Sequence, residues 1–275
     1  MGFDRRIFLR SAGAIAGCAL GRTGLVDAAE VRSGRAATTR KEWEALVGAA
    51  GQANFTCVRT SEILEGPFYY ESSPLRRAIS EQHAGERVRL GITIAGIILA
   101  DRCMPLTGAI VDVWQTDGMG LYSNVGADLQ GVDTVGQTFL RGHQVTDENG
   151  YVEFDTVVPG WEIMAAPAPL HVALRTTHVH VKVFHEREVL TTQLFFPDPL
   201  LDDLYANVEP YKSHRAMTAP GLTRAYERIP NGKDRFYLES HSQPVTVTRE
   251  KGMLVAKATI GVASQGNLGF TPLFR

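Results

Sequence analysis

The chain has 275 residues, of which 44% are hydrophobic and 21% are charged, and its net charge is −2. This is ordinary globular composition with enough apolar residues for a sizeable core, in one large all-β domain or two smaller ones. Lysine and arginine are spread along the sequence, so nothing in it indicates a partner nucleic acid or a polybasic membrane surface.

The N-terminal segment differs in kind from the rest of the chain. Asp4-Arg-Arg-Ile-Phe-Leu9 precedes a weakly apolar run, rich in Ala and Gly, from Ser11 to Leu20. This resembles a twin-arginine export signal, and the run is too short and too poor in large apolar residues for a membrane span. We expect residues 1–29 to be that signal, and the protein to be exported to the periplasm or cell envelope.

Two ways of processing this signal remain open. The sequence Ile-Ala-Gly-Cys at 15–18 resembles a lipoprotein processing box, which would leave a lipid anchor at Cys18. The sequence Val26-Asp-Ala28 would instead suit a signal peptidase that releases a soluble protein. The mature chain is expected to be either free or lipid-anchored.

Cys57 and Cys103 are the only other cysteines. In an oxidising compartment an even pair indicates a disulfide, which would stabilise the fold by roughly 3–4 kcal/mol through the entropy of the unfolded chain. Two free buried thiols are the alternative.

The first part of the mature chain is expected to contain little structure. Residues 30–38 resemble a linker, and the capping-box spacing from Thr39 to Glu42 with apolar residues at helical intervals predicts a short helix over 39–47. The segment Glu65-Gly-Pro-Phe-Tyr-Tyr70 is predicted to be a loop because of its Gly-Pro break. Its aromatic side chains would pack on a core or line a pocket.

From Arg87 onward the sequence has the alternation of β-strands. The predicted strands are 87–99, 108–115, 137–145, 151–157, 170–184, 190–196, 236–247 and 253–262. Between 197 and 233 the sequence is polar and has no clear period. Short strands with regular turns and hardly any helix predict an all-β fold, an antiparallel β-sandwich over residues 57–275.

One predicted strand carries two histidines on the same side. Side chains alternate along a strand, so His178, His180 and Lys182 share one face, while the valines between them and after them face the core. Two imidazoles one strand step apart can converge on a metal ion, for which histidine is the commonest ligand. The alternative is a pair of half-buried histidines that hydrogen-bond to neighbouring strands.

Five sequence motifs stand in a fixed order along the chain. They are Glu65-Gly-Pro-Phe-Tyr69, Val113-Trp-Gln-Thr-Asp117 with Gly120-Leu-Tyr122-Ser, Val158-Pro-Gly-Trp-Glu162, Arg175-Thr-Thr-His178-Val-His180 and Leu190-Thr-Thr-Gln-Leu-Phe-Phe196. Together they resemble the intradiol ring-cleavage dioxygenases, the non-haem iron enzymes that cleave catechol and protocatechuate. The resemblance covers residues 57–200 well and the C-terminal strands more loosely.

The resemblance implies a ferric ion held by two tyrosinates and two histidines, with a catechol-type aromatic and O₂ as substrates. The matching positions are Tyr122, His178 and His180 for the metal, Arg175 and Gln193 for catalysis, and Pro67, Phe68 and Arg175 for substrate binding. Phenolate is a hard, strongly donating ligand that favours Fe(III), and a neighbouring cation would stabilise an anionic catecholate. Family members are often dimers or larger, so a homo-oligomer is possible.

Each of these positions also has an ordinary structural interpretation. Tyr122 would be a loop aromatic, Arg175 the partner of a surface carboxylate, and Gln193 a hydrogen-bonding partner of backbone groups. Trp114 is assigned to the core.

The chain departs from the family pattern at residue 162. Glu162 stands where the second tyrosine ligand belongs, and it would ligate the metal and accept a substrate proton, as a weaker donor and base than phenolate. Three outcomes follow: an Fe(III) enzyme, a site for Fe(II) or another metal with altered chemistry, or a catalytically reduced relative. A rival of another class is a non-catalytic β-sandwich module that holds an aromatic or carbohydrate with the loop at 65–70.

Overall fold

The computed structural model describes residues 58–99, 102–162, 175–214 and 228–263. The predicted export signal, the linker, the helix at 39–47 and Cys57 lie outside these residues. Cys103 is disulfide-bonded, and its predicted pairing with Cys57 stays a prediction.

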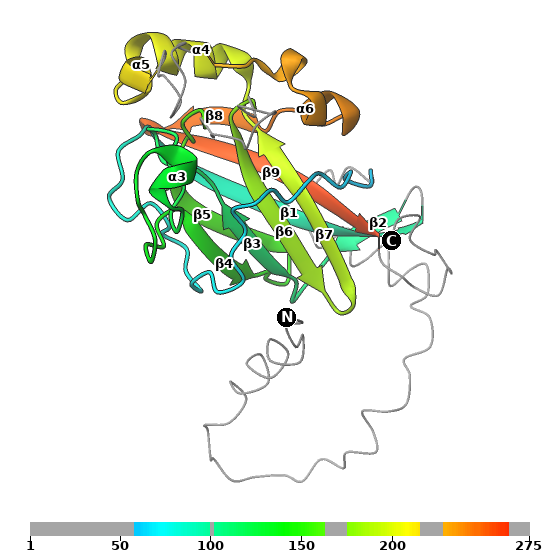
Figure 1. The fold of residues 1–275 in the computed structure, drawn as a ribbon. Coiled ribbons are helices and arrows are strands. Elements are labelled where there is room, and N and C mark those ends of the chain that lie inside the picture. Colours follow the sequence, from blue (N-terminus) through cyan, green and yellow to red (C-terminus); the bar gives the residue numbers. More distant parts are fainter. Residues whose placement is uncertain (1–57, 100–101, 163–174, 215–227, 264–275) are drawn as a thin grey trace, which may run out of the picture. The chain divides into compact units, whose positions relative to one another are not determined.

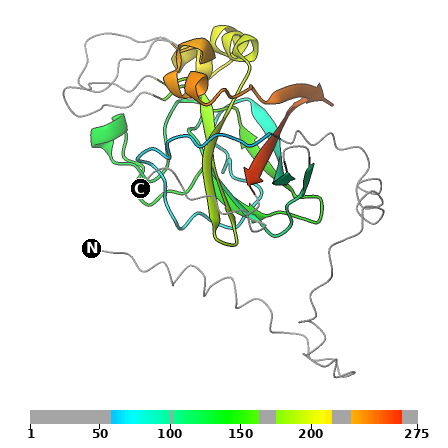
Figure 2. The same cartoon turned by 90° about the vertical axis from the view of Figure 1, so that its right-hand side faces the viewer.

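The described strands form two sheets, as the predicted β-sandwich requires (Figures 1 and 2). The first sheet has the order β2-β1-β9-β8, and β5 also pairs with β1. Its strands are β1 (Arg87–Leu99), β2 (Arg102–Pro105), β5 (Tyr151–Val157), β8 (Thr246–Glu250) and β9 (Met253–Ala263). The second sheet has the order β4-β3-β6-β7. Its strands are β3 (Ile110–Trp114), β4 (Arg141–Val145), β6 (His178–His185) and β7 (Glu188–Phe195).

The strand pairing differs from the prediction in one respect. Every described pair is antiparallel except β1 and β9, which run parallel from Val88 beside Leu254 to Ile97 beside Ala263. The predicted β-sandwich is confirmed, and this one strand pair departs from its antiparallel pattern. The pair joins strands from opposite ends of the domain, so no turn signal in the sequence reports it.

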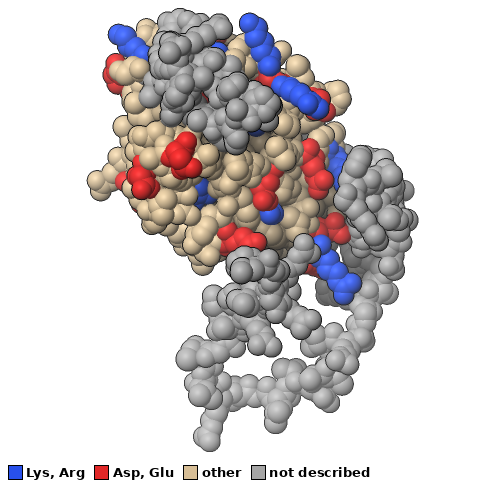
Figure 3. Space-filling view, in the orientation of Figure 1, with Lys and Arg blue, Asp and Glu red and all other residues tan. Residues whose placement is uncertain are grey.

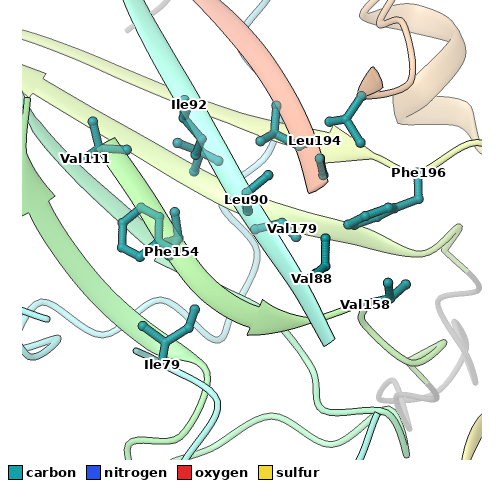
Figure 4. Close-up of a cluster of buried hydrophobic side chains, with 14 of the residues drawn as sticks. Ile79, Val88, Leu90, Ile92, Val111, Phe154, Val158, Val179, Leu194 and Phe196 are labelled. Carbon is teal, nitrogen blue, oxygen red and sulfur yellow. The ribbon is translucent and has the colours of Figure 1, made fainter. Parts of the chain in front are cut away.

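The core lies between the two sheets (Figure 4). From the second sheet it takes alternate residues of β3 and β6, which are Val111, Val113, Val179, Val181 and Val183. From the first sheet it takes Val88, Leu90, Ile92 and Ile94 of β1 with Phe154 of β5. Each such side chain contributes roughly 1.5–3 kcal/mol by leaving water, so this layer supplies most of the stability.

Several predicted strand boundaries move in the structure. Strand β5 has the predicted bounds, and β3 is shorter than predicted by a few residues. Strand β4 begins only at Arg141, because residues 139–140 form a turn in which Leu140 has φ +56°. Strand β6 begins at His178, since residues 175–177 are held outside the ladder, and β2 was not predicted at all.

The region after β7 contains helices that the sequence analysis missed. They are α4 (Asp198–Asn207), α5 (Tyr211–His214), η2 (Asn231–Lys233) and α6 (Arg235–Glu239), and a further short helix, α3 (Ala127–Gln130), lies earlier in the chain. The predicted strand at 236–247 is wrong at its start, where Asp234 accepts the N–H of Tyr237 (3.0 Å) and so caps α6. Only its last two residues, Thr246 and Val247, lie in a strand, β8. Figures 1 and 2 both show α4, α5 and α6 gathered at one end of the sheets.

The segment from residue 58 to 79 covers the face of the second sheet that points away from the core (Figure 1, cyan). It is fastened to β7 where the N–H of Ile63 donates to Thr191 O (2.9 Å), and to β4 where the N–H of Arg76 donates to His143 O (3.1 Å). Side chains on that outer face are therefore enclosed between the sheet and this segment.

Charged side chains of both signs are interspersed on the surface seen in Figure 3. Exposed ion pairs such as Arg77 with Asp155 contribute about 0–1 kcal/mol each, so packing rather than surface charge holds the fold. No helix of the described residues has the length and apolar character needed to cross a membrane.

Candidate metal centre and active site

The outer face of the second sheet carries the two predicted histidines. The alternation of β6 places His178, His180 and Lys182 there, as predicted, and buries the valines between them on the opposite face. Trp114 of β3 lies opposite His180 in the ladder, and the two rings stack with centroids 4.7 Å apart. Trp114 is buried, as predicted, in a small core cluster with Tyr122 and Val125 that is separate from the larger one between the sheets.

Three donor atoms converge above this face. The Nε2 atoms of His178 and His180 are 3.0 Å apart, and the Tyr122 hydroxyl lies 3.2 Å from Nε2 of His180. All three side chains are almost completely buried. The sequence analysis predicted this set, and the fold brings it together.

The hydrogen bonds of His178 define its tautomer. Its Nδ1 lies 2.6 Å from Thr176 O, and a carbonyl only accepts, so Nδ1 carries the proton and the lone pair of Nε2 faces His180. Nδ1 of His180 has no partner among the described residues. Burial lowers the pKa of His178, and burial together with His178 lowers that of His180 further, so both imidazoles are neutral.

Tyr122 is positioned by the tight turn that follows β3. The Asp117 carboxylate accepts the N–H groups of Met119 (2.9 Å) and Leu121 (3.0 Å), which folds the chain back on itself. The backbone of Tyr122 is then held on both sides by Gln130, which accepts its N–H (2.9 Å) and donates to its carbonyl (3.0 Å). A buried side-chain amide thus fixes the place from which the phenol projects.

The same turn positions Glu162. The N–H of Gly160 donates to Asp117 O (2.7 Å), and a Cβ on Gly160 would lie 2.5 Å from Gly120 N, so only glycine fits. Glu162, which is 9% exposed, lies beside the Tyr122 hydroxyl. Burial raises the pKa of Tyr122 well above its usual value, and the charge of Glu162 and its hydrogen bond with the phenol raise it further. Tyr122 is therefore a neutral phenol beside a carboxylate.

The donor set fits a metal ion once the phenol is counted. Among the described residues, no three His, Cys, Asp or Glu side chains are grouped so as to hold a metal. Tyr122 adds a third donor to His178 and His180. Two nitrogens bound at right angles to one ion, each at roughly 2.1 Å, would lie about 3 Å apart, which is the separation seen here. Two neutral imidazoles and a phenol, with a carboxylate adjacent, are ligands that suit iron.

Arg175 and Gln193 also meet at this site. Nη2 of Arg175 donates to Gln193 Oε1 (2.6 Å), and Nε2 of Gln193 donates to Leu64 O (2.9 Å). Nε of Arg175 donates to Asp234 (2.7 Å), whose side chain is fully buried, so the partner of the arginine is not a surface carboxylate. Gln193, to which Arg175 donates, lies opposite His180 in the ladder of β6 and β7, and the charge of Arg175 contributes to lowering the pKa of both histidines.

The predicted loop at 65–70 lies against the same donors. A Cβ on Gly66 would be 3.5 Å from Cε1 of His180, and the Phe68 ring lies 4.8 Å from that of Tyr122. Lys182, one strand step beyond His180, forms an ion pair with Glu65. Phe68 is therefore at the site. Pro67, the other residue of this loop that was predicted to bind substrate, is exposed to solvent.

Sequence reasoning missed the site's contribution from the C-terminal helical segment. Asp234 binds Arg175, and the Phe236 ring lies 4.4 Å from the guanidinium carbon of Arg175. The available signal was local: an aspartate followed by residues that suit a helix, which is the pattern of an N-cap. Nothing local indicated the contact with Arg175.

The family-model comparison agrees with this geometry. A model whose description is "Dioxygenase" matches residues 64–229, more than half of the chain. The chain belongs to the intradiol ring-cleavage dioxygenase family.

Individual relatives show how far the similarity extends. The chain is 30% identical to a chlorocatechol 1,2-dioxygenase of Rhodococcus opacus over 52% of its own length and 59% of the relative's. It is 29% identical to a catechol 1,2-dioxygenase of Candida albicans over 55% and 50% of the two lengths. The chain thus spans about half the length of the curated relatives that it matches.

A solved structure shows the same fold. The intradiol ring-cleavage dioxygenase from Tetranychus urticae is 24% identical, with a TM-score of 0.61. The match covers 80% of this chain and 97% of that one.

Proposed function

We propose that this protein is an iron-dependent dioxygenase that opens a catechol-type ring between its two hydroxyl-bearing carbons. Iron would be held by Tyr122, His178 and His180, with Glu162 as the fourth ligand. The observation that carries the proposal is a cluster of buried donors around Nε2 of His180, with Nε2 of His178 at 3.0 Å and the Tyr122 hydroxyl at 3.2 Å. The relatives named for catechol and chlorocatechol support the substrate class. The overall reaction adds both atoms of O₂ to the ring and gives a dicarboxylate.

Bound iron would supply a Lewis-acidic, redox-active centre at which the catechol and O₂ react. The protein's own part begins with the Tyr122 phenol, which must lose its proton to become a ligand. Glu162 is the adjacent base that would receive it, since its carboxylate already accepts a hydrogen bond from that phenol. Metal binding would release that proton onward to solvent, and the carboxylate, ionised again, would take up one catechol proton when substrate enters.

Arg175 would bind the anionic form of the substrate. Its guanidinium is held on two sides, so it stays directed while negative charge develops on the substrate oxygens. Phe68 and Trp114 place aromatic surface around Tyr122 and His180, which limits water at the reacting atoms.

A second candidate is Fe(II) or another metal held by His178, His180 and Glu162, because two histidines and a carboxylate suit non-haem Fe(II). Its support is the place of Glu162, a nearly buried carboxylate beside the Tyr122 hydroxyl, which itself lies 3.2 Å from Nε2 of His180. Converting Glu162 to Tyr tests the position of residue 162 at the metal, which both candidates require. In a ferric tyrosinate site the substitution should alter the visible spectrum and the rate of ring cleavage, whereas an unchanged spectrum and rate would mean that residue 162 is not at the metal.

The direct test is oxygen uptake by purified protein of measured metal content against a panel of catechols. We expect uptake that depends on bound iron and yields a ring-opened dicarboxylate. Protein expressed with iron supplied that retains almost none and consumes no O₂ would favour the non-catalytic binding module instead.

We also propose that residues 1–29 direct twin-arginine export, that residues 30–56 link them to the β-sandwich, and that Cys57 pairs with Cys103. Replacing Arg5 and Arg6 by Lys should retain the protein in the cytoplasm. Fractionation would show this, and labelling of Cys18 with a lipid precursor would separate an anchored from a free mature chain.

A further inference from the structure

We infer that Asp234 is a positioning residue that sets the direction of the Arg175 guanidinium toward the reacting oxygens of the substrate. The inference rests on the proposed function, in which Arg175 meets the substrate anion. It assigns a role to a residue 59 positions away in sequence, from the helical segment that follows the second sheet.

Asp234 is a buried carboxylate whose two oxygens are both in use. Oδ2 accepts Nε of Arg175 (2.7 Å) and the N–H of Thr176 (2.8 Å), while Oδ1 accepts the N–H of Tyr237 (3.0 Å). The side chain has no exposed surface. Burying a carboxylate is costly unless it is paired and hydrogen-bonded, and these three donors satisfy it. One carboxylate thereby joins the start of α6 to the residues just before His178.

The guanidinium of Arg175 is constrained at three places. Its Nε donates to Asp234 and its Nη2 donates to Gln193 (2.6 Å), and the Phe236 ring lies 4.4 Å from the guanidinium carbon. The guanidinium is planar and rigid, so two hydrogen bonds on different nitrogens fix its plane. Among the described residues Nη1 has no hydrogen-bond partner, which leaves this nitrogen to the substrate.

The ion pair with Asp234 also determines how Arg175 acts on the substrate. Asp234 compensates its positive charge, so Arg175 acts less as a net charge that attracts an anion and more as a fixed donor. Loss of the carboxylate would free the guanidinium while leaving its charge. Substrate would still bind, but with the donor misplaced, and a small misplacement can cost about 100-fold in rate. The expected signature is therefore a fall in kcat with little change in KM.

Two variants separate this role from simple support of the fold. Asp234→Asn keeps the size of the side chain and an acceptor oxygen. Asp234→Ser keeps a good N-cap for α6 but is too short to reach Arg175. Glu239→Gln is the matched control, because Glu239 belongs to the same helix and its pair with Arg235 is exposed. Metal content and the midpoint of thermal unfolding of each variant show that fold and site are retained.

The experiment measures kcat and KM of the iron-loaded full chain for catechol, and the anaerobic affinity for 4-nitrocatechol by absorbance. Asp234→Asn and Asp234→Ser should each lower kcat by roughly 10- to 100-fold and change KM by less than about threefold. In an Arg175→Met background, neither should lower kcat further. Glu239→Gln should behave as the unchanged protein.

Four results would contradict the inference, and the last of them would contradict the proposed function as well. An unchanged kcat in both Asp234 variants would do so, and so would losses that multiply fully in the Arg175→Met background, because Asp234 would then act independently of Arg175. If the unchanged protein cleaves catechol and Arg175→Met does so equally well, the role of Arg175 is wrong. Iron-loaded unchanged protein that cleaves no catechol would contradict the proposed function itself, and the inference with it.

Discussion

The two faces of the second sheet are made by alternate residues of the same strands, yet they have opposite character. The inner face of β6 presents Val179, Val181 and Val183 to the first sheet, and all three are buried among other apolar side chains. The outer face presents His178, His180 and Lys182, which contact a phenol, an indole and a carboxylate. The same strand thus contributes to the core with one face and to the site with the other, because successive side chains of a strand point to opposite sides.

Unfavourable groups are concentrated on the outer face. Nδ1 of His180 is buried without a partner among the described residues, and Asp112 of β3 is a buried carboxylate on the same face. Burial raises the pKa of Asp112 to about 6, although the Ser73 hydroxyl donates to it at 2.7 Å. The inner face of β6 has no buried unpaired or ionisable group. We therefore expect the apolar packing between the two sheets to offset the destabilisation by the buried polar groups of the outer face.

The largest expected effect comes from the outer face. His180→Ala removes a proposed metal ligand. Substituting residues that only hydrogen-bond to a metal ligand already lowers metal affinity or activity by about 10–100-fold, so here activity should fall by at least about 100-fold. The free energy of unfolding of the metal-free protein should change little, because losing an unpaired buried nitrogen offsets part of the lost packing. Oxygen uptake and urea unfolding measure the two quantities. Retained activity with intact metal binding would remove His180 from the site.

The pH dependence of stability should report Asp112. Its pKa is raised from about 3.8 to about 6 by burial, so the folded state binds the proton more tightly than the unfolded state. The resulting stabilisation is complete below about pH 4 and is lost as the pH rises through 6, a change of about 3 kcal/mol. Urea unfolding of Asp112→Asn and of the unchanged protein from pH 4 to 7 should give curves whose difference follows this fall. Parallel curves would contradict it.

Substitution on the inner face should have the converse result. Val181→Ala leaves a cavity between the sheets and should lower the free energy of unfolding by roughly 2–3 kcal/mol. The activity of each folded, iron-loaded molecule should remain within about twofold, since the side chain points away from the site. Denaturant unfolding and specific activity per bound iron check both statements. A large loss of specific activity would show that the two faces are not independent.

The smallest effect is expected far from both faces. Arg235 and Glu239 form an exposed pair on α6, and such helix pairs contribute about 0.3–0.5 kcal/mol. Arg235→Ala should change the thermal midpoint only slightly and leave kcat unaffected. A marked fall in kcat would mean that α6 positions the site through its surface as well as through Asp234.

Much of this architecture follows from local patterns. Strand β5 has its predicted bounds because the turn at Asp147 to Gly150 precedes it and Pro159-Gly160 follows it. Period 2 alone predicts that His178 and His180 share a face. The family motifs supply Tyr122 and Arg175. The helices after β7 were missed because their buried residues are few and their caps are short-range signals. The pairing of Asp234 with Arg175 depends on how distant segments pack, which no local pattern contains.

The central claim is that Tyr122, on the outer face, completes a metal site with the two histidines. It is tested most directly by the visible absorption of iron-loaded protein with and without Tyr122→Phe, at equal iron content. We predict a tyrosinate-to-iron absorption band in the unchanged protein that disappears in Tyr122→Phe. An equal band in both proteins, or none in the unchanged protein carrying stoichiometric Fe(III), would contradict the account.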